Sequence, residues 1–229
     1  MFGQTATVDG LKFNLAGLPI PAKKKRHLRR GDYELPERIL ISKFVEPGMR
    51  VLELGASLGI ISTFLARNIG PTGSLLSVEA DLSLLPFWER NIHANGLKGK
   101  CVNALACPTW NANVPVRLLA NNFQPCADKL SGRITASTEA SARTVPWKTA
   151  RTICEENDFE PTALIVDIEG TETVWTEEPA NFPSSVRLLI AEFHPQYTGP
   201  DIAADCAQAV LDAGFRLRGY QNHVLAFSR

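Results

Sequence analysis

The sequence contains few cysteines, and none of them belongs to a metal-binding or disulfide pattern. Five cysteines occur among 229 residues. They are widely spaced and include no Cys-x-x-Cys pair: Cys101, Cys107, Cys126, Cys154 and Cys206. An odd number without a spacing motif argues against a disulfide framework and a zinc site, and it is typical of proteins in a reducing compartment. We therefore expect a cytoplasmic protein.

Long apolar runs and an excess of charge are also missing. No stretch approaches the roughly 20 apolar residues that span a bilayer, and the N-terminus lacks the continuous apolar block of a signal peptide. Lysine plus arginine equals aspartate plus glutamate, at 24 each. This balance creates no overall field toward a polyanion or a membrane surface. We expect no membrane association, and we do not expect nucleic acid as a partner.

One local charge cluster departs from this balance. Residues 23–30 read Lys-Lys-Lys-Arg-His-Leu-Arg-Arg, a run that could bind an anionic substrate, a phosphosugar or nucleic acid. No aromatic residues alternate with these charges to stack bases, so a solvated loop is the favoured interpretation. Pro19 and Pro21 precede the run and lead us to expect no helix beyond them.

The length favours a single domain, 1–229, with two less regular segments. A chain of this size can bury a substantial core. Residues 1–35 show little pattern beyond a short alternation, and we expect an N-terminal cap over a pocket. Most of 107–147 lacks a helical period and contains short β-prone pieces such as 114–119, which predicts a β-rich insert. A short helix over 147–157 is expected to follow.

The most informative stretch is 51–67, where an apolar run ends in an acid and is followed by two glycines and helical spacing. Residues 51–59 read Val-Leu-Glu-Leu-Gly-Ala-Ser-Leu-Gly, which predicts a strand, a tight turn and a helix. Gly55 would let the turn approach a ligand, and Gly59 would let the helix lie close to its strand. Unpaired N–H groups at the helix N-terminus could then bind a carboxylate or a phosphate.

Two kinds of adenosine cofactor compete for this geometry. Glu79 ends the next apolar run, 20 residues after Gly59, where a carboxylate can accept both hydroxyls of a ribose. A nicotinamide dinucleotide favours glycine where this chain has Ser57, because its pyrophosphate needs the space. The pattern Glu53-x-Gly55-x-x-x-Gly59 instead resembles the first motif of class I S-adenosylmethionine (SAM) methyltransferases. Their ligand has no pyrophosphate and is cationic, which suits an acid at Glu53.

Strands that alternate with helices predict an α/β fold with a doubly wound, mostly parallel sheet. Besides 51–54, the strand-like runs are 75–79, 101–105, 163–166, 188–193, 215–218 and 224–227, of which the last two suggest an antiparallel pair. Such sheets bind ligands at the carboxyl ends of their strands. Six titratable residues fall at those ends: Glu53, Glu79, Asp167, Glu169, Glu192 and His194.

Several motifs together resemble the FkbM-type methyltransferases. The matching pieces, in order, are Tyr33-Glu34, 52–59, Glu79-Ala80-Asp81 with 91–96, the Val-Asp-Ile-Glu-Gly-Thr-Glu run at 166–172, and Glu192-Phe193-His194-Pro195. They cover about residues 31–195. The chain departs from the family's usual residues at Glu53, Ser57 and Thr149-Ala150, where Asp, Asn and a Leu-Asp pair are commoner. The resemblance implies a seven-stranded, Rossmann-like class I methyltransferase fold with an antiparallel last strand.

The resemblance also implies a function and a cofactor site. Family members mostly methylate hydroxyl oxygens of natural products or sugars, so it implies SAM as cofactor and a small-molecule or glycan acceptor. Glu53 and Gly55 would face the methionine part of SAM, Glu79 the ribose, and Asp167 the sulfonium. The full set of expected cofactor-binding residues is Glu34, Glu53, Gly55, Ser57, Gly59, Glu79, Ala80, Asn103, Ala104 and Asp167, with Asn103 and Ala104 against adenine.

Deprotonation of an acceptor hydroxyl calls for a base, and three residues are candidates. Asp167 and Glu169 are two apart and would point the same way if the strand stayed regular, and His194 has an ordinary pKa suited to neutral pH. A metal site among Asp167, Glu169, Glu192 and His194 is conceivable, but we expect none. Two other functions stay open, a nicotinamide-dependent oxidoreductase and a non-catalytic adenosine-binding protein. The oligomeric state also stays open, with a homodimer as one option.

Overall fold

The computed structural model describes residues 4–106, 116–118, 134–136, 147–169, 171–177 and 181–229. Its centre is a seven-stranded sheet in the order β12-β13-β11-β10-β3-β4-β5. Five strands are mutually parallel: β3 (Arg50–Leu54), β4 (Ser74–Glu79), β5 (Lys100–Asn103), β10 (Ala163–Val166) and β11 (Leu188–Glu192). The last strand, β13 (Val224–Ser228), runs antiparallel to both β11 and β12 (Arg216–Gln221). The predicted sheet is confirmed, including its antiparallel last strand.

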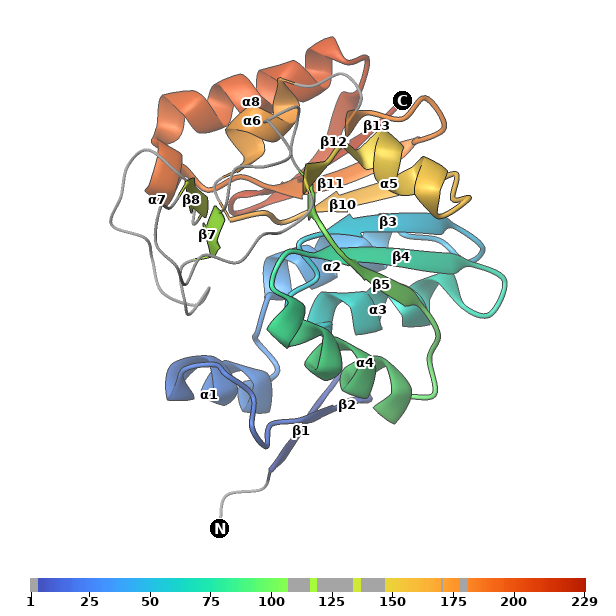
Figure 1. Cartoon of the computed structure of the whole chain (residues 1–229), viewed down its shortest axis with the longest axis vertical. Helices are drawn as coiled ribbons and strands as arrows, with labels where there is room; N and C mark the ends of the chain where they lie inside the picture. The colour runs from blue at the N-terminus through green and yellow to red at the C-terminus, as the bar shows by residue number, and fades with distance from the viewer. Residues whose placement is uncertain (1–3, 107–115, 119–133, 137–146, 170, 178–180) are drawn as a thin grey trace.

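The parallel strands are apolar on both faces, and each face buries a separate helical layer. Leu52 and Leu54 point to one side, with Leu164 and Val166 of β10, and pack with α5 (Ala150–Glu156), α6 (Glu172–Thr176) and α8 (Pro200–Asp212). Neighbouring side chains in the strands point the other way and pack with α2 (Leu35–Phe44), α3 (Ile60–Ile69) and α4 (Leu85–Ala94). Figure 1 shows the sheet between α3 and α4 on one side and α5, α6 and α8 on the other.

The N-terminal segment forms a third apolar cluster outside the α3–α4 layer (Figure 1). The hairpin β1 (Thr5–Val8) and β2 (Leu11–Asn14) packs there with α1 (Ala22–Arg30). Phe13 and Leu28 are completely buried in this cluster, against Phe64 of α3. Most of the described part of the expected cap therefore packs on helices, and among residues 4–35 only Tyr33 and Glu34 line the cavity described below.

The expectation that Pro19 and Pro21 exclude a following helix is wrong. Helix α1 begins at Ala22, directly after Pro21, whose φ of −57° and ψ of 152° are those of a residue just outside a helix. A proline there is tolerated because the first helical N–H groups have no intrahelical partner. The basic run 23–30 is therefore helical rather than a solvated loop, and Leu28 anchors it to the core.

The segment after β5 contains four short strands among its described residues. β6 (Leu105–Ala106) pairs in parallel with β9 (Trp147–Lys148), and β7 (Val116–Leu118) pairs antiparallel with β8 (Ile134–Ala136). The β-prone piece 114–119 thus contains a strand, while most of the predicted insert lies outside the described residues. The helix expected over 147–157 begins later, at Ala150. Thr149 is its N-cap, and the Thr149 side chain accepts a hydrogen bond from the Thr152 N–H.

Two short helices complete the described part of the chain: η1 (Leu82–Leu84), a 3-10 turn before α4, and α7 (Pro195–Thr198), which follows β11 after Phe193 and His194. None of the helices in the described ranges is long and apolar enough to cross a membrane.

Candidate functional site

The turn after β3 is fitted against the end of β10. Gly55 has φ +90°, and a Cβ on it would lie 1.7 Å from the backbone carbonyl oxygen of Asp167. Glycine is therefore required at this position by the approach of two neighbouring strand ends, not only by a ligand. Gly59, with φ +74°, has a different neighbour from the one expected: its Cβ would lie 2.8 Å from the Trp88 ring, so this glycine admits α4 rather than a strand.

Glu53 is buried at the end of β3 and is held by hydroxyl groups. It is 2% exposed, and its Oε2 accepts hydrogen bonds from Ser62 Oγ at 2.6 Å and Ser77 Oγ at 2.5 Å. The indole N–H of Trp88 donates to Ser62 Oγ at 2.7 Å and extends this network. Burial raises the pKa of Glu53 to about 7, although both serine hydrogen bonds oppose the rise.

Glu79 is held in a similar way, by backbone N–H groups. Its two carboxylate oxygens accept from Ser57 N at 2.7 Å and from Asp81 N at 2.6 Å. The carboxylate therefore ties the turn after β3 to the end of β4. Burial raises the pKa of Glu79 to about 7, against the effect of the two N–H groups.

At the end of β5, the polar side chain holds the end of β4 in place and does not line the cavity described below. Asn103 Nδ2 donates to the carbonyl oxygens of Glu79 and Ala80, at 2.8 and 2.9 Å. Ala104 is 2% exposed and packs in the core. The expected adenine contacts of Asn103 and Ala104 stay a prediction.

A cavity lies where the carboxyl ends of β3, β10 and β11 meet the start of α2. It brings together five of the predicted cofactor residues: Glu34, Glu53, Gly55, Ser57 and Asp167. Gly59, Glu79, Ala80, Asn103 and Ala104 do not line it. Tyr33, Glu37 and Glu192 complete its polar lining, and no lysine or arginine is among the described residues that line it.

Glu34 sits at the entrance of α2 in a left-handed conformation, with φ 47° and ψ 40°. Burial, together with the charges of Glu37 and Asp167, holds its pKa well above the ordinary value, and Lys24 of α1 opposes this. Glu37 was not predicted as a site residue. One signal for it was available, since it follows Glu34 by only three residues and lies in the first turn of α2.

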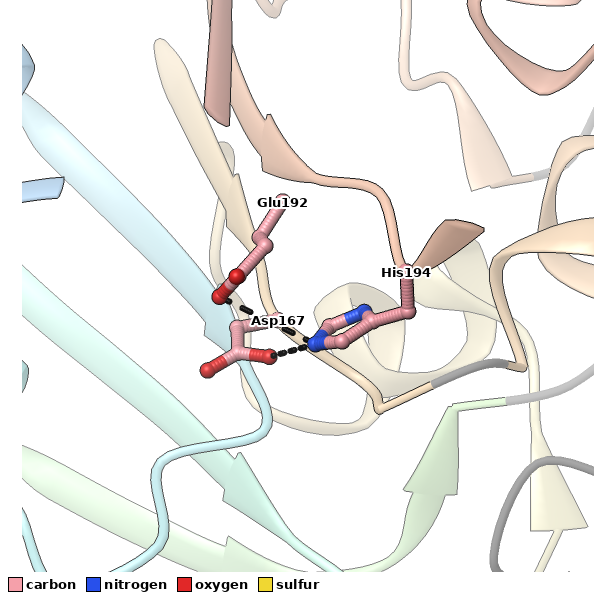
Figure 2. A group of neighbouring side chains, drawn as sticks. All are labelled: Asp167, Glu192 and His194. Carbon is pink, nitrogen blue, oxygen red and sulfur yellow. Dashed lines mark ion pairs between the residues drawn. The ribbon is translucent and has the colours of Figure 1, made fainter. Parts of the chain in front are cut away.

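His194 lies at the centre of a second group of carboxylates, two residues after the end of β11. Its Nδ1 bonds Glu172 Oε1 at 2.9 Å, and its Nε2 points toward Asp167 Oδ1 at 3.5 Å and Glu192 Oε2 at 3.8 Å (Figure 2). Glu169 Oε2 lies 3.6 Å from the same nitrogen. Strand β10 ends at Val166 and Glu169 has φ 56°, so the two acids face one histidine through a turn rather than along a regular strand.

The titration of this group is set by burial and mutual repulsion. Burial raises the pKa of Asp167 to about 6, and His194 opposes the rise. Burial and the charges of Asp167 and Glu37 raise the pKa of Glu192 to about 11. Burial lowers the pKa of His194, but the hydrogen bond to Glu172 and the nearby carboxylates outweigh it and raise the pKa to about 9. The His194 pKa is thus above the value expected for a base near neutral pH.

Glu172 is the other residue that sequence reasoning did not assign to the site. It is 2% exposed and lies in the first turn of α6. Its place in the run 166–172 was noted, but the bond to His194 depends on how α6 packs on the sheet.

Two solved structures share this fold at a TM-score of 0.50. Fibrillarin from Aeropyrum pernix, in complex with natively bound SAM, is 11% identical, and the match covers 85% of this chain and 73% of that chain. A SAM-dependent methyltransferase from Aquifex aeolicus is 12% identical, and the match covers 90% and 96%. The fold is that of the class I methyltransferases. No protein-family model matches the sequence, and no curated protein matches it.

Proposed function

We propose that the chain is a SAM-dependent O-methyltransferase of the FkbM type, acting on a hydroxyl of a small molecule such as a natural product or a sugar. The observation that carries this proposal is the acidic cavity at the carboxyl ends of β3 and β10, in a class I methyltransferase fold. SAM carries a cationic sulfonium and a cationic amine, which carboxylates favour. The motifs at 52–59, 166–172 and 192–195 support the FkbM type and its hydroxyl acceptors.

The residues present fit this cofactor. Glu34, Glu53 and the Gly55–Ser57 turn would hold its amino-acid part, and Glu79 would accept its ribose hydroxyls while still fixing the turn through Ser57. When bound, SAM supplies an electrophilic methyl group on its sulfonium. The chain then has to place the acceptor oxygen in line with that group, which depends on position more than on covalent help.

Asp167 is the best candidate to accept the proton of the acceptor hydroxyl. Its side chain is 31% exposed at the cavity, and a pKa of about 6 leaves it mostly ionised at neutral pH. Its Oδ1 is buried and receives no hydrogen bond within the described structure. His194, with a pKa raised to about 9, would instead stabilise the ionised form of Asp167. Glu169 is the remaining candidate, on the same side of His194.

The nicotinamide alternative is less compatible with the cavity. A pyrophosphate would need backbone N–H groups at the turn after β3, but the Ser57 N–H already donates to Glu79. The anionic lining would also repel it. A binding protein without chemistry would not need the cluster around His194. Cytoplasmic location and the absence of a nucleic-acid partner stay predictions, and the oligomeric state stays open.

Calorimetry with SAM, S-adenosylhomocysteine and NAD tests the cofactor. We expect binding of the first two and not of NAD, with the exposed Glu46→Gln variant as control. Tight binding of NAD without binding of SAM would overturn the proposal. Incubation with methyl-labelled SAM and an extract of the source organism, followed by identification of the labelled product, then identifies the acceptor.

A further inference from the structure

Three side chains beside the cavity have the geometry of a metal-ligand set. One ligand atom from each of Asp167, Glu192 and His194 lies within 4.8 Å of the other two. The three residues lie at the ends of two adjacent parallel strands: Asp167 follows β10, Glu192 is the last residue of β11, and His194 lies two residues beyond it. Figure 2 shows the His194 Nε2 edge and both carboxylates pointing toward one another. A cation placed between them could be bound with only small side-chain shifts.

The orientation of His194 is an independent observation that points to a ligand. Its side chain is only 4% exposed, and the buried Glu172 fixes the ring through Nδ1 at 2.9 Å. This leaves Nε2 aimed into the group of carboxylates. The three oxygens around Nε2 are 3.5, 3.6 and 3.8 Å away, beyond the usual hydrogen-bond distance of about 2.7–3.2 Å. Metal-binding histidines are typically oriented in this way, by a carboxylate on the other ring nitrogen.

The carboxylates give a second reason. Asp167 Oδ1 is buried without a hydrogen-bond partner in the described structure, as is Oε2 of Glu37, a residue only 7% exposed that lines the same cavity as Glu192. Burying several acids next to one histidine is costly unless a cation offsets their repulsion. Lys24 supplies part of this charge, as its effect on Asp167 shows.

We propose that Asp167, Glu192 and His194 form a binding site for one divalent transition-metal ion, with Glu172 as the positioning residue for His194. Two carboxylates and one imidazole suit Mn²⁺ or Zn²⁺ better than Mg²⁺, which prefers oxygen ligands alone. Metal binding at His194 Nε2 releases the proton from that nitrogen. The Nδ1 nitrogen keeps its proton and donates it in the hydrogen bond to Glu172. This proposal replaces the sequence-based expectation of no metal.

The place of the site suggests what the ion does, and this part rests on the proposed function. Asp167 and Glu192 line the cofactor cavity as well as the metal site. Three protein ligands leave coordination positions for an acceptor hydroxyl, whose proton a bound cation makes easier to remove.

Electron paramagnetic resonance with Mn²⁺ tests the site without cofactor or acceptor, so its result does not depend on methyl transfer. We expect one Mn²⁺ per chain and a nitrogen coupling from His194 in the pulsed spectrum. Asp167→Asn, Glu192→Gln and His194→Gln should each weaken Mn²⁺ by at least about tenfold, and any residual binding to the last variant should lack the nitrogen coupling. Absence of Mn²⁺ binding to the wild-type chain, or binding without nitrogen coupling, would overturn the proposal.

Two further variants distinguish a specific metal site from nonspecific attraction of the cation to acidic residues. Glu172→Gln keeps the size of the positioning side chain and should weaken Mn²⁺ by about 10- to 100-fold. Glu46→Gln removes one exposed acid far from the site in sequence and should leave the affinity unchanged. Equal losses in both variants would indicate nonspecific attraction and also overturn the proposal. If a ligand variant fails to fold, thermal stabilisation of the wild-type chain by Zn²⁺ or Mn²⁺, and not by Mg²⁺, supports the site, and no stabilisation contradicts it.

Discussion

The acids on the two sides of the cavity differ in their neighbours. On the β3–β4 side, Glu53 and Glu79 accept hydrogen bonds from serine hydroxyls and backbone N–H groups, and these bonds hold the turn and strand ends together. On the β10–β11 side, oxygens of Asp167 and Glu192 lie 3.5 and 3.8 Å from His194 Nε2, and the charges of Asp167 and Glu37 raise the pKa of Glu192. The hydrogen bonds preorganise the first side without a ligand. On the second side, the carboxylates repel one another, and a bound cation would relieve that repulsion. We therefore propose that the first side serves cofactor recognition and the second side the chemistry.

The largest expected effect comes from a substitution at Gly55, where the turn after β3 contacts the end of β10. Gly55→Ala should destabilise the protein by about 4 kcal/mol or more, because the new Cβ would lie 1.7 Å from the Asp167 carbonyl oxygen, at φ +90°. Urea denaturation measures this loss. Gly96→Ala is the matched control, since Gly96 has φ +66° but nothing within 4 Å of its Cβ, and it should cost only about 1–2 kcal/mol. Equal losses would show that the close approach is not required.

Glu53 should make stability depend on pH. Its folded-state pKa of about 7 exceeds the ordinary 4.5, so the unfolded chain loses its proton first as pH rises. The folded state therefore loses stability between about pH 4.5 and 7, by on the order of 3 kcal/mol for this group. Glu53→Gln should lack that loss, so the difference in unfolding free energy between variant and parent should grow in the variant's favour from pH 5 to pH 8. A constant difference would place the Glu53 pKa near its ordinary value.

Asp167 tests the chemical side. Asp167→Asn should lower kcat with the identified acceptor by about 10²-fold, because the amide can neither accept the hydroxyl proton nor bind the proposed metal ion as a carboxylate does. Calorimetry should show that most SAM affinity remains, since Glu34 and Glu53 also line the cavity. The parental kcat should fall as pH drops through about 6, where Asp167 becomes protonated. Near-parental kcat in the variant would mean that positioning alone suffices, or that Glu169 is the base.

Glu79 tests the recognition side and should have the smallest effect. Glu79→Ala should weaken SAM and S-adenosylhomocysteine alike, by about 1–3 kcal/mol, because both share the ribose. Part of the loss would come from freeing the Ser57 and Asp81 N–H groups. Calorimetry on both ligands checks this, and Ser83→Ala is the control at an exposed neighbour of the same turn. A loss for SAM alone would place Glu79 near the sulfonium instead.

The strands and their polar ends were determined by the sequence itself. Runs such as 51–54 and 163–166 are apolar at every position except for Glu53, and a chain of alternating strands and helices has few ways to bury both faces of such strands. Since parallel strands end at one edge, the acids after them meet there. These are local or repetitive features, and they predicted the sheet, its antiparallel last strand and the edge on which Asp167 and His194 lie.

Other features were decided only by the tertiary structure. Helix α1 forms after Pro21 because Leu28 finds an apolar cluster made by the β1–β2 hairpin and α3, which no local rule contains. Glu37 becomes a cavity residue through the packing of α2 against the strand ends. Glu172 orients His194 because α6 brings them to 2.9 Å, across 22 residues of sequence. Whether a carboxylate meets a hydroxyl, an N–H group or another acid depends on which elements lie beside it, and this distinguishes the proposed recognition side of the cavity from the proposed chemical side.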